Sequence, residues 1–204
     1  MRKGMMCQRG LHRSTTLHDL DSPMTVPMTP LDPTRPNAAF LRSHPAHLIA
    51  LGLGSGLSPW AAGTAGTLWA WAAFAAINPW MTEWRWALVL LLMLPLSCWA
   101  SAVTARNLRT PDPGCIVIDE ILAFWIVLWM MTPAGPLEQL CAFGLFRFFD
   151  AVKPGPVGWA DQLFHHMDPN TARHGWAKAG WGIVLDDLVA AFCTLMVVAL
   201  WRAW

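Results

Sequence analysis

The chain has 204 residues, of which 55% are hydrophobic and only 13% are charged, and its mean hydropathy is +0.38. So few charged residues would cover the surface of a soluble protein poorly, and this composition favours a membrane protein over a Trp-rich soluble core. The formal net charge of +1, without a basic stripe interleaved with aromatic residues, argues against a nucleic-acid partner. Five cysteines without a CxxC pair indicate neither disulfides nor a zinc site.

The amino-terminal segment, residues 1–43, is polar and shows no sustained hydrophobic periodicity. It carries six Lys or Arg residues and a series of closely spaced prolines, which predicts a disordered, basic tail. No apolar stretch follows its basic start, so we expect no signal peptide. Residues 44–204 are predicted to form one membrane-embedded domain.

Four apolar runs follow the tail, each near the length needed to cross a bilayer core: residues 64–80, 84–103, 116–132 and 183–204. A fifth run, residues 137–152, has a shorter apolar centre and could cross at a tilt, re-enter or lie at the interface. Tryptophans flank the runs, as expected of rings that settle at the level of the lipid headgroups. We therefore predict an all-α, multi-pass helical membrane bundle with four or five membrane helices.

The distribution of basic residues predicts an orientation for this bundle. With five spans and the amino terminus inside, twelve of the fourteen Lys and Arg residues lie on the inner side, and only Arg85 and Arg202 lie outside. This asymmetry agrees with the positive-inside rule. The same topology brings the polar segments between the runs to the inner surface, so the chemistry is expected on the cytoplasmic side.

Two adjacent acidic pairs stand at the predicted starts of two membrane helices: Asp119 with Glu120, and Asp186 with Asp187. Acids in a first helical turn can simply complement the helix dipole and cap free N–H groups. Ionisable groups at the edge of the hydrocarbon are costly, however, and one acid would suffice for capping. Because oxygen-rich clusters suit a hard cation such as Mg²⁺, both pairs are candidate metal ligands.

The segment between these pairs supplies positive charge. Arg147, Asp150 and Lys153 recur at i, i+3 and i+6, which places them on one helical face up to the break at Pro154. Arg147 and Asp150 could form a simple ion pair, but the Arg fork and the Lys point charge also suit a phosphomonoester dianion. Asp161 follows in a predicted loop that contains Trp and Gly, and alone it would indicate little.

The segment GLGSGLSPWAAGTAGT, residues 52–67, is rich in glycine and hydroxyl side chains just before the first apolar run. Its N–H groups, with Ser55, Ser58 and Thr64, could form a nest that binds the substrate's phosphate. It is neither a Walker loop, since no Lys follows the glycines, nor a dinucleotide fingerprint, since Pro59 interrupts it. Small residues for close helix packing and a Thr cap are an equally good interpretation.

Two other phosphatase chemistries fit less well. Cys141 and Arg147 have the C-x5-R spacing of thiolate phosphatases, but an apolar helix whose N–H groups are already bonded cannot cradle a phosphate. Cys7 and Arg13 have the same spacing within the tail. The seven histidines form no phosphohistidine-type motif, and we interpret them as loop residues.

Taken together, four blocks resemble the phosphatidylglycerophosphatase A family: GSGLSPWAAGTAGT, DPGCIVIDE, FRFFDAVKPGPVGWAD and GWGIVLDDLVAA. The resemblance implies a multi-pass enzyme of the bacterial inner membrane that uses Mg²⁺. Its substrate would be phosphatidylglycerophosphate, and its product phosphatidylglycerol, in phospholipid biosynthesis. The matching catalytic candidates are Asp119, Glu120, Arg147, Asp150, Lys153, Asp161, Asp186 and Asp187. The tail and an insertion around residues 165–178 depart from the family pattern.

The mechanism expected from these residues is metal-assisted hydrolysis, in which Arg147 and Lys153 bind the substrate and neutralise charge on the phosphoryl group. The expected ligands of Mg²⁺ are several of Asp119, Glu120, Asp150, Asp186 and Asp187. A CDP-alcohol phosphotransferase is disfavoured because its DG-x2-AR motif is absent. A non-catalytic membrane cation carrier and a phosphatase of another lipid phosphate stay open as alternatives.

Overall fold

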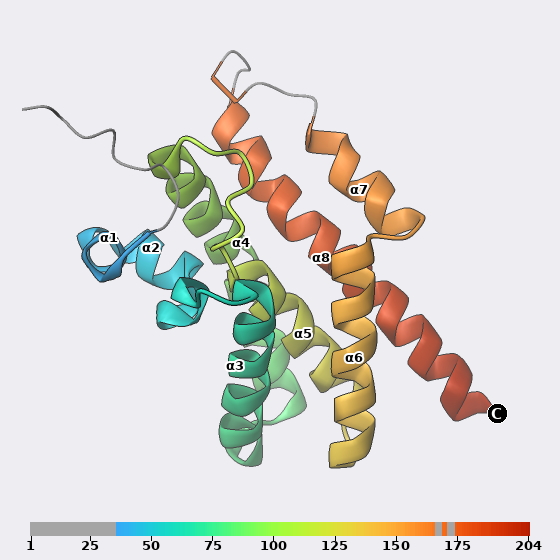
Figure 1. The fold of residues 1–204 in the computed structure, drawn as a ribbon. Coiled ribbons are helices and arrows are strands. Elements are labelled where there is room, and N and C mark those ends of the chain that lie inside the picture. Colours follow the sequence, from blue (N-terminus) through green and yellow to red (C-terminus); the bar gives the residue numbers. More distant parts are fainter. Residues whose placement is uncertain (1–35, 166–168, 171–173) are drawn as a thin grey trace, which may run out of the picture. The chain divides into compact units, whose positions relative to one another are not determined.

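The computed structural model describes residues 36–165, 169–170 and 174–204 (Figure 1). In this part of the chain every regular element is a helix, which confirms the all-α prediction. The elements are α1 (Ala38–Ser43), α2 (Pro45–Ala50), the 3₁₀ helix η1 (Gly52–Leu57), α3 (Ala62–Ile77), the 3₁₀ helix η2 (Asn78–Trp80), α4 (Glu83–Leu108), α5 (Ile118–Met131), α6 (Pro136–Val152), α7 (Pro156–His165) and α8 (Gly175–Ala203).

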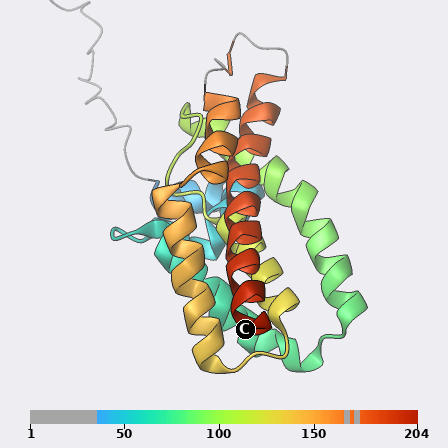
Figure 2. The same ribbon diagram turned by 90° about the vertical axis from the view of Figure 1, so that its right-hand side faces the viewer.

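Helix α5 is the central helix of the bundle. It packs against α3, α4, α6 and α8, which surround it in both ribbon views (Figures 1 and 2). Ten of its fourteen residues are buried, including Phe124, Val127 and Leu128. A helix that is apolar all round must be covered on every side, and this sequence is apolar almost everywhere except at Asp119 and Glu120.

Helices α4 and α8 cross at close range beside α5. A Cβ atom placed on Gly180 of α8 would lie only 2.4 Å from the carbonyl oxygen of Cys98 in α4. The glycine therefore lets the two backbones approach each other, as small residues do at many helix contacts in membranes. This crossing positions the middle of α8 relative to the rest of the bundle.

Among the described residues, two helices are long and apolar enough to cross a bilayer, Glu83–Leu108 and the Gly175–Arg202 stretch of α8. They correspond to the second and last predicted spans and suggest a membrane protein. The other runs form α3, α5 and α6, with 16, 14 and 17 residues. At about 1.5 Å per residue these helices are about 21–26 Å long, shorter than the roughly 30 Å hydrocarbon core. The expectation of four or five spans is thus supported for two.

The two long helices expose large apolar side chains. Leu91 and Leu92 of α4 are 67% and 60% exposed, and Phe192 and Leu200 of α8 are 63% and 62% exposed. Contiguous apolar surfaces of this kind are rare on soluble monomers but are ordinary where a helix faces lipid. The outer faces of α4 and α8 therefore agree with a membrane setting.

Three segments differ from the sequence-based expectations. Helix α1 lies inside the predicted tail, because Asn37 caps its first turn by accepting from the Phe40 N–H at 2.9 Å. The predicted loop that carries Asp161 is helix α7, which packs against α8. Helix α8 begins at Gly175, eight residues before the predicted start of the last apolar run. Residues 1–35, most of the predicted tail, lie outside the described residues.

The glycine-rich segment joins α2 to α3 and packs against the loop that leads into α5. The Val117 N–H donates to the Ala50 carbonyl at 2.9 Å. A Cβ on Gly56 would lie 2.1 Å from the Cys115 carbonyl oxygen, and one on Gly66 would lie 2.7 Å from the Val117 Cβ. These close contacts leave room for glycine only and hold the start of α5 in place.

His47 was expected to be a loop residue, but it belongs to helix α2 and lies in a buried polar network at the same end of the bundle. Its Nδ1 is 3.0 Å from the Phe40 carbonyl oxygen, and its Nε2 is 2.8 Å from Nδ2 of Asn107, the amide donor. This pairing needs a proton on Nδ1 and a free lone pair on Nε2, which is the neutral imidazole. Burial and the nearby His44 lower the pKa of His47, although the Phe40 carbonyl opposes this shift.

We predict that acid destabilises the fold through His47. Its folded pKa is below the unfolded value, so the unfolded state takes up the proton first and stability falls as the pH drops below about 6.5. Loss of the Asn107 hydrogen bond corresponds to about 1 kcal/mol, or about 2–4 °C in Tm. Thermal melting in detergent at pH 7.5 and 5.0 should show a smaller pH effect in His47→Gln than in wild type. The same pH effect in both proteins would contradict this role, and His174→Gln, an exposed position, is the control.

Candidate active site

The four acids of the two pairs are buried together between α5 and α8. Asp119 and Glu120 are 8% and 9% exposed, and Asp186 and Asp187 are 8% and 3% exposed. The charges of Asp119, Asp186 and Asp187 lie close enough to repel one another. Asp119 Oδ1 and Asp187 Oδ2 are buried without a hydrogen-bond partner. Buried carboxylate oxygens in this state are costly unless something else binds them.

Helix capping accounts for neither pair fully. Asp119 and Glu120 lie in the first turn of α5, as predicted, but no side chain caps this helix. Asp186 and Asp187 lie in the interior of α8, more than ten residues beyond Gly175, rather than at a helix start. The helix dipole acts within the first turn and therefore gives no reason for the second pair. Both pairs instead face the same buried region.

Arg147 of α6 connects two of the acidic positions. Its Nη1 donates to Asp150 Oδ2 at 2.5 Å and lies 3.1 Å from Glu120 Oε1. The predicted ion pair between Arg147 and Asp150 is therefore present, and the same guanidinium also serves the first acidic pair. Its side chain remains 20% exposed, so an arriving anion can reach it.

Lys153 has an equivalent position between α7 and α8. It ends α6 with a positive φ of 48°, and this turn directs its Nζ to Asp161 Oδ1 at 2.5 Å and to Asp186 Oδ2 at 2.6 Å. Burial alone would lower the pKa of Lys153, but the two carboxylates outweigh it and raise that pKa above its ordinary value. The ammonium group therefore stays charged at neutral pH and above.

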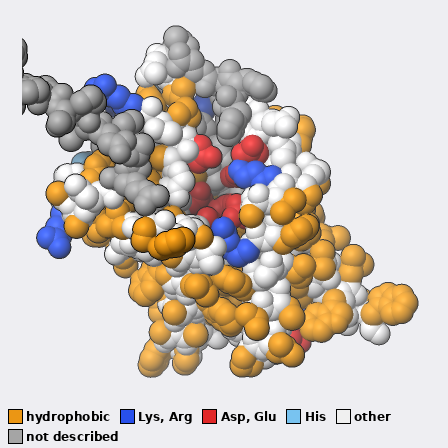
Figure 3. Space-filling view, viewed as in Figure 1, with side chains coloured by type: hydrophobic (Ala, Val, Ile, Leu, Met, Phe, Trp, Pro, Cys, Tyr) orange, Lys and Arg blue, Asp and Glu red, His pale blue; other side chains and the backbone are white. Residues whose placement is uncertain are grey.

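The site is rich in negative charge. Six acids, counting Asp161, surround the two cations Arg147 and Lys153, an excess of four negative charges if all are ionised. Figure 3 shows the charged side chains gathered in a hollow above a largely hydrophobic surface. The donor set is oxygen, and two of its oxygens are unpartnered, which fits a hard divalent cation. In the described part of the chain, however, no three His, Cys, Asp or Glu side chains are already arranged as metal ligands.

The predicted hydroxyl residues lie in the glycine-rich segment, but their bonds are local. The Ser55 hydroxyl donates to the Gly52 carbonyl at 3.0 Å, and the Ser58 hydroxyl donates to the Trp60 carbonyl at 2.8 Å. Thr64 is half-buried on α3. The segment instead contacts Glu120 of the site through Gly63 and Thr67. Their spacing of four residues places both on one face of α3.

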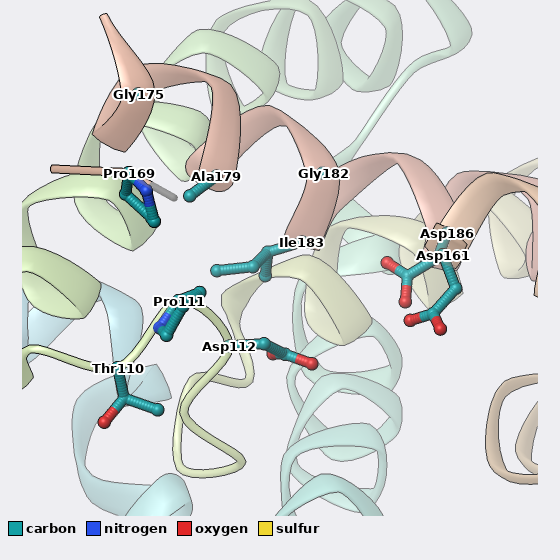
Figure 4. Close-up of a pocket in the computed structure, with 10 residues that line it drawn as sticks. All are labelled: Thr110, Pro111, Asp112, Asp161, Pro169, Gly175, Ala179, Gly182, Ile183 and Asp186. Atoms are coloured by element: carbon teal, nitrogen blue, oxygen red, sulfur yellow. The ribbon is translucent and has the colours of Figure 1, made fainter. Parts of the chain in front are cut away.

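A third acidic residue of the DPGCIVIDE block also borders the site. Asp112, from the loop between α4 and α5, lines a cavity of about 230 Å³ together with Asp161 of α7 and Asp186 of α8 (Figure 4). The close-up shows the carboxylates of Asp161 and Asp186 side by side. Sequence reasoning did not single out Asp112, because a lone acid between two prolines resembles an ordinary turn.

The four cysteines in the described part of the chain do not form a thiolate site. Cys141 is exposed on α6, whereas Arg147 of the C-x5-R spacing bonds to Glu120 and Asp150. Burial raises the pKa of Cys115 to about 11, so this thiol stays protonated at neutral pH. The interpretation of the Cys141–Arg147 spacing as non-catalytic agrees with this geometry, whereas Cys7 and Arg13 lie outside the described residues.

Arg147 and Lys153 among these acids form a site suited to an anionic group, and the two candidate membrane helices suggest a membrane protein. Residues 48–202 match the family described as phosphatidylglycerophosphatase A. The chain is 37% identical to the Escherichia coli phosphatidylglycerophosphatase A over 154 residues, which is 72% of this chain and 78% of that protein. The chain therefore belongs to the phosphatidylglycerophosphatase A family, and it is a lipid phosphatase of that family.

Two further relatives extend the comparison. The Haemophilus influenzae phosphatidylglycerophosphatase A is 31% identical over 161 residues, covering 79% of this chain and 91% of that protein. A Bacteroides thetaiotaomicron protein, provisionally named phosphatidylinositol-3-phosphatase, is 32% identical over 162 residues, covering 76% and 92%. No solved structure matches the chain.

We predict that Arg147 cannot be replaced by Lys. Arg147→Lys keeps the charge but loses the guanidinium fork, so kcat/KM for phosphate release from a lipid phosphate should fall at least about tenfold. The loss should stay below the roughly hundredfold to thousandfold typical of removing a catalytic donor outright. Arg85→Lys is the matched control, since Arg85 lies over the exposed Trp84 ring, 5.7 Å from its centroid. Equal activity of the two variants would contradict a phosphate-binding role for Arg147.

Proposed function

We propose that the protein hydrolyses phosphatidylglycerophosphate to phosphatidylglycerol and phosphate in a reaction that depends on Mg²⁺. The observation that carries this proposal is the placement of Arg147 and Lys153 among buried acids that have unpartnered oxygens. The positive charges of Arg147 and Lys153 would bind the phosphate, and the carboxylate oxygens would bind a hard metal ion. The names of the Escherichia coli and Haemophilus influenzae relatives support the choice of substrate.

The residues that would hold Mg²⁺ are carboxylates from three helices, and the cation would supply charge neutralisation at the phosphoryl oxygens. These candidate ligands are Asp119, Glu120, Asp150, Asp186 and Asp187. Asp119 Oδ1 and Asp187 Oδ2 have no hydrogen-bond partner, so a metal ion could bind them without breaking an existing hydrogen bond. Glu120, Asp150 and Asp186 each bond one of the two cations through one oxygen, and each would give up that contact to hold the metal once the substrate binds Arg147 and Lys153.

The cations and acids of the chain can divide the remaining chemistry. Arg147 and Lys153 bind phosphoryl oxygens and oppose the charge that develops on them in the transition state. Hydrolysis forms a bond between phosphorus and a water oxygen and breaks the bond to the glycerol oxygen. A buried carboxylate takes the proton that the water releases, and the glycerol oxygen leaves as a hydroxyl after gaining a proton.

The substrate also determines where the reaction takes place. A lipid phosphate carries its phosphate at the membrane surface, so the acidic site must lie near the ends of the spanning helices. We propose that this site faces the cytoplasm in a multi-pass protein of the bacterial inner membrane, and the distribution of Lys and Arg along the chain supports this orientation. Arg106 and Arg109, at the end of α4 that precedes the Asp112 loop, agree with this orientation.

A second candidate substrate is another lipid phosphate. It is favoured by the Bacteroides thetaiotaomicron relative, which is about as similar to the chain as the Haemophilus influenzae protein but is named for a different headgroup. A non-catalytic cation carrier fits less well, because it would not need Arg147 and Lys153 among its acids. Comparison of phosphate release from phosphatidylglycerophosphate and phosphatidylinositol 3-phosphate separates the two phosphatase candidates.

The purified chain should release phosphate from phosphatidylglycerophosphate with Mg²⁺ and lose this activity in EDTA. Asp119→Asn and Asp187→Asn should each lower kcat by about a hundredfold or more, because each removes a buried charge from the site. Cys141→Ser should retain activity, since its side chain is exposed outside the site. Activity that survives EDTA and disappears in Cys141→Ser would overturn the metal proposal, and a folded protein without any phosphate release would favour the carrier.

A further inference from the structure

Thr67 of α3 touches both members of the ion pair that connects α5 to α6. Its Oγ1 lies 3.3 Å from Glu120 Oε2 and 3.5 Å from the Nη1 of Arg147. The side chain is fully buried, so water cannot replace these contacts. Thr67 ends the GSGLSPWAAGTAGT block, but its sequence position alone does not distinguish it from a residue that serves only its helix. Its hydroxyl also makes a common bond within α3, to the Gly63 carbonyl at 2.9 Å.

A hydroxyl group has one proton to donate and two lone pairs that accept. The proton of Thr67 has two acceptors within reach, the Gly63 carbonyl and Glu120 Oε2. When the proton points to Glu120, the hydroxyl oxygen can accept from Arg147, and it then stands between the cation and the carboxylate. Glu120 therefore keeps one donor in the buried site when Arg147 turns toward an anion.

Gly63, one turn earlier on the same face of α3, makes this arrangement possible. A Cβ atom at this position would lie 2.0 Å from Glu120 Oε1 and 3.0 Å from Arg147 Nη1. Glu120 thus fits directly against the α3 backbone, beside the hydroxyl group of Thr67. A Cβ atom at position 63 would therefore displace the carboxylate.

We propose that Thr67 is a positioning residue of the phosphatase site. It holds the Glu120 carboxylate at the correct position relative to the Arg147 guanidinium, on the face of α3 where Gly63 leaves room for that carboxylate. Thr67 does not touch the phosphoryl group. Its hydroxyl sets where the carboxylate and the guanidinium lie, and it keeps Glu120 bonded while Arg147 binds phosphate. This inference rests on the proposed function, because it assigns Arg147 to the substrate.

Thr194 of α8 provides a matched comparison within the chain. It is also fully buried, and its hydroxyl donates to the Ala190 carbonyl four residues earlier at 2.8 Å, the same local bond that Thr67 makes. If Thr67 served only its helix, Thr67→Val and Thr194→Val would have the same effect. Val has nearly the shape of Thr, so both variants remove the hydroxyl without leaving a large cavity.

The experiment uses the full chain in detergent and measures kcat and KM with phosphatidylglycerophosphate, and Tm for each variant. Thr67→Val should lower kcat about tenfold to a hundredfold, the range for losing a partner that orients a functional side chain. Thr67→Ser should restore most of this activity, and Thr194→Val should resemble wild type. A kcat for Thr67→Val within about twofold of the Thr194→Val value would overturn the inference.

A second pair of variants covers the case in which Thr67→Val fails to fold. Gly63→Ala meets the movable ends of the Glu120 and Arg147 side chains, so it should keep its Tm while kcat falls. Gly144→Ala, on α6, meets no atom within 4 Å and should keep both. Normal activity of a stable Gly63→Ala variant would contradict the dependence of the site on the position of the Glu120 carboxylate.

Binding separates this inference from the proposed function. A non-hydrolysable phosphonate analogue of the lipid should bind at least about fivefold more weakly to Thr67→Val than to Thr67→Ser, whether or not the protein hydrolyses the lipid. If wild type releases no phosphate but shows this difference in binding, the proposed function fails and the positioning role stands. If wild type is active and the two variants bind and react alike, the proposed function stands and the positioning role fails.

Discussion

The structure depends on the burial of opposite charges near one end of an apolar bundle. Four acids with less than a tenth of their surface exposed come from α5 and α8, and α6 supplies Arg147 and Lys153 to reach them. Charges taken out of water are tolerated only when partners surround them. Helices α3, α6 and α7 therefore present Thr67, Arg147 and Asp161 to this site, and the remaining excess of negative charge is the basis for the proposed cation.

Small residues determine how closely the helices can bring these charges together. Gly63 lets Glu120 lie against α3, Gly66 admits Val117 at the start of α5, and Gly180 brings α8 onto α4. Lys153 reaches its two carboxylates because α6 ends on it in a left-handed conformation. The geometry of the site thus depends on how closely the helix backbones approach one another. Substitutions at these glycines are expected to change the distances between helices and, through them, the activity.

Hydrophobic runs and charge spacing predicted much of this arrangement. The ranges 84–103, 116–132 and 137–152 correspond to α4, α5 and α6, because long apolar segments leave little choice of conformation. Lys153 and Asp161 were recognised as candidates, but not their contact, since it depends on a turn and on helix α7, which was expected to be a loop. Thr67 and Asp112 escaped notice because an ordinary helix bond and an ordinary turn explain them locally. A contact between two segments that are far apart in the chain cannot be predicted from the sequence of either segment alone.

The central claim, that the acids of α5 and α8 together hold a divalent cation, is tested most directly by metal binding. Mn²⁺ can replace Mg²⁺ as a paramagnetic probe, and its binding to the detergent-solubilised protein can be followed by the loss of the free-ion signal. The account predicts binding that Mg²⁺ competes away and that the Asp119→Asn and Asp187→Asn substitutions each weaken by at least about tenfold. Mn²⁺ binding that is unchanged in both variants would contradict it.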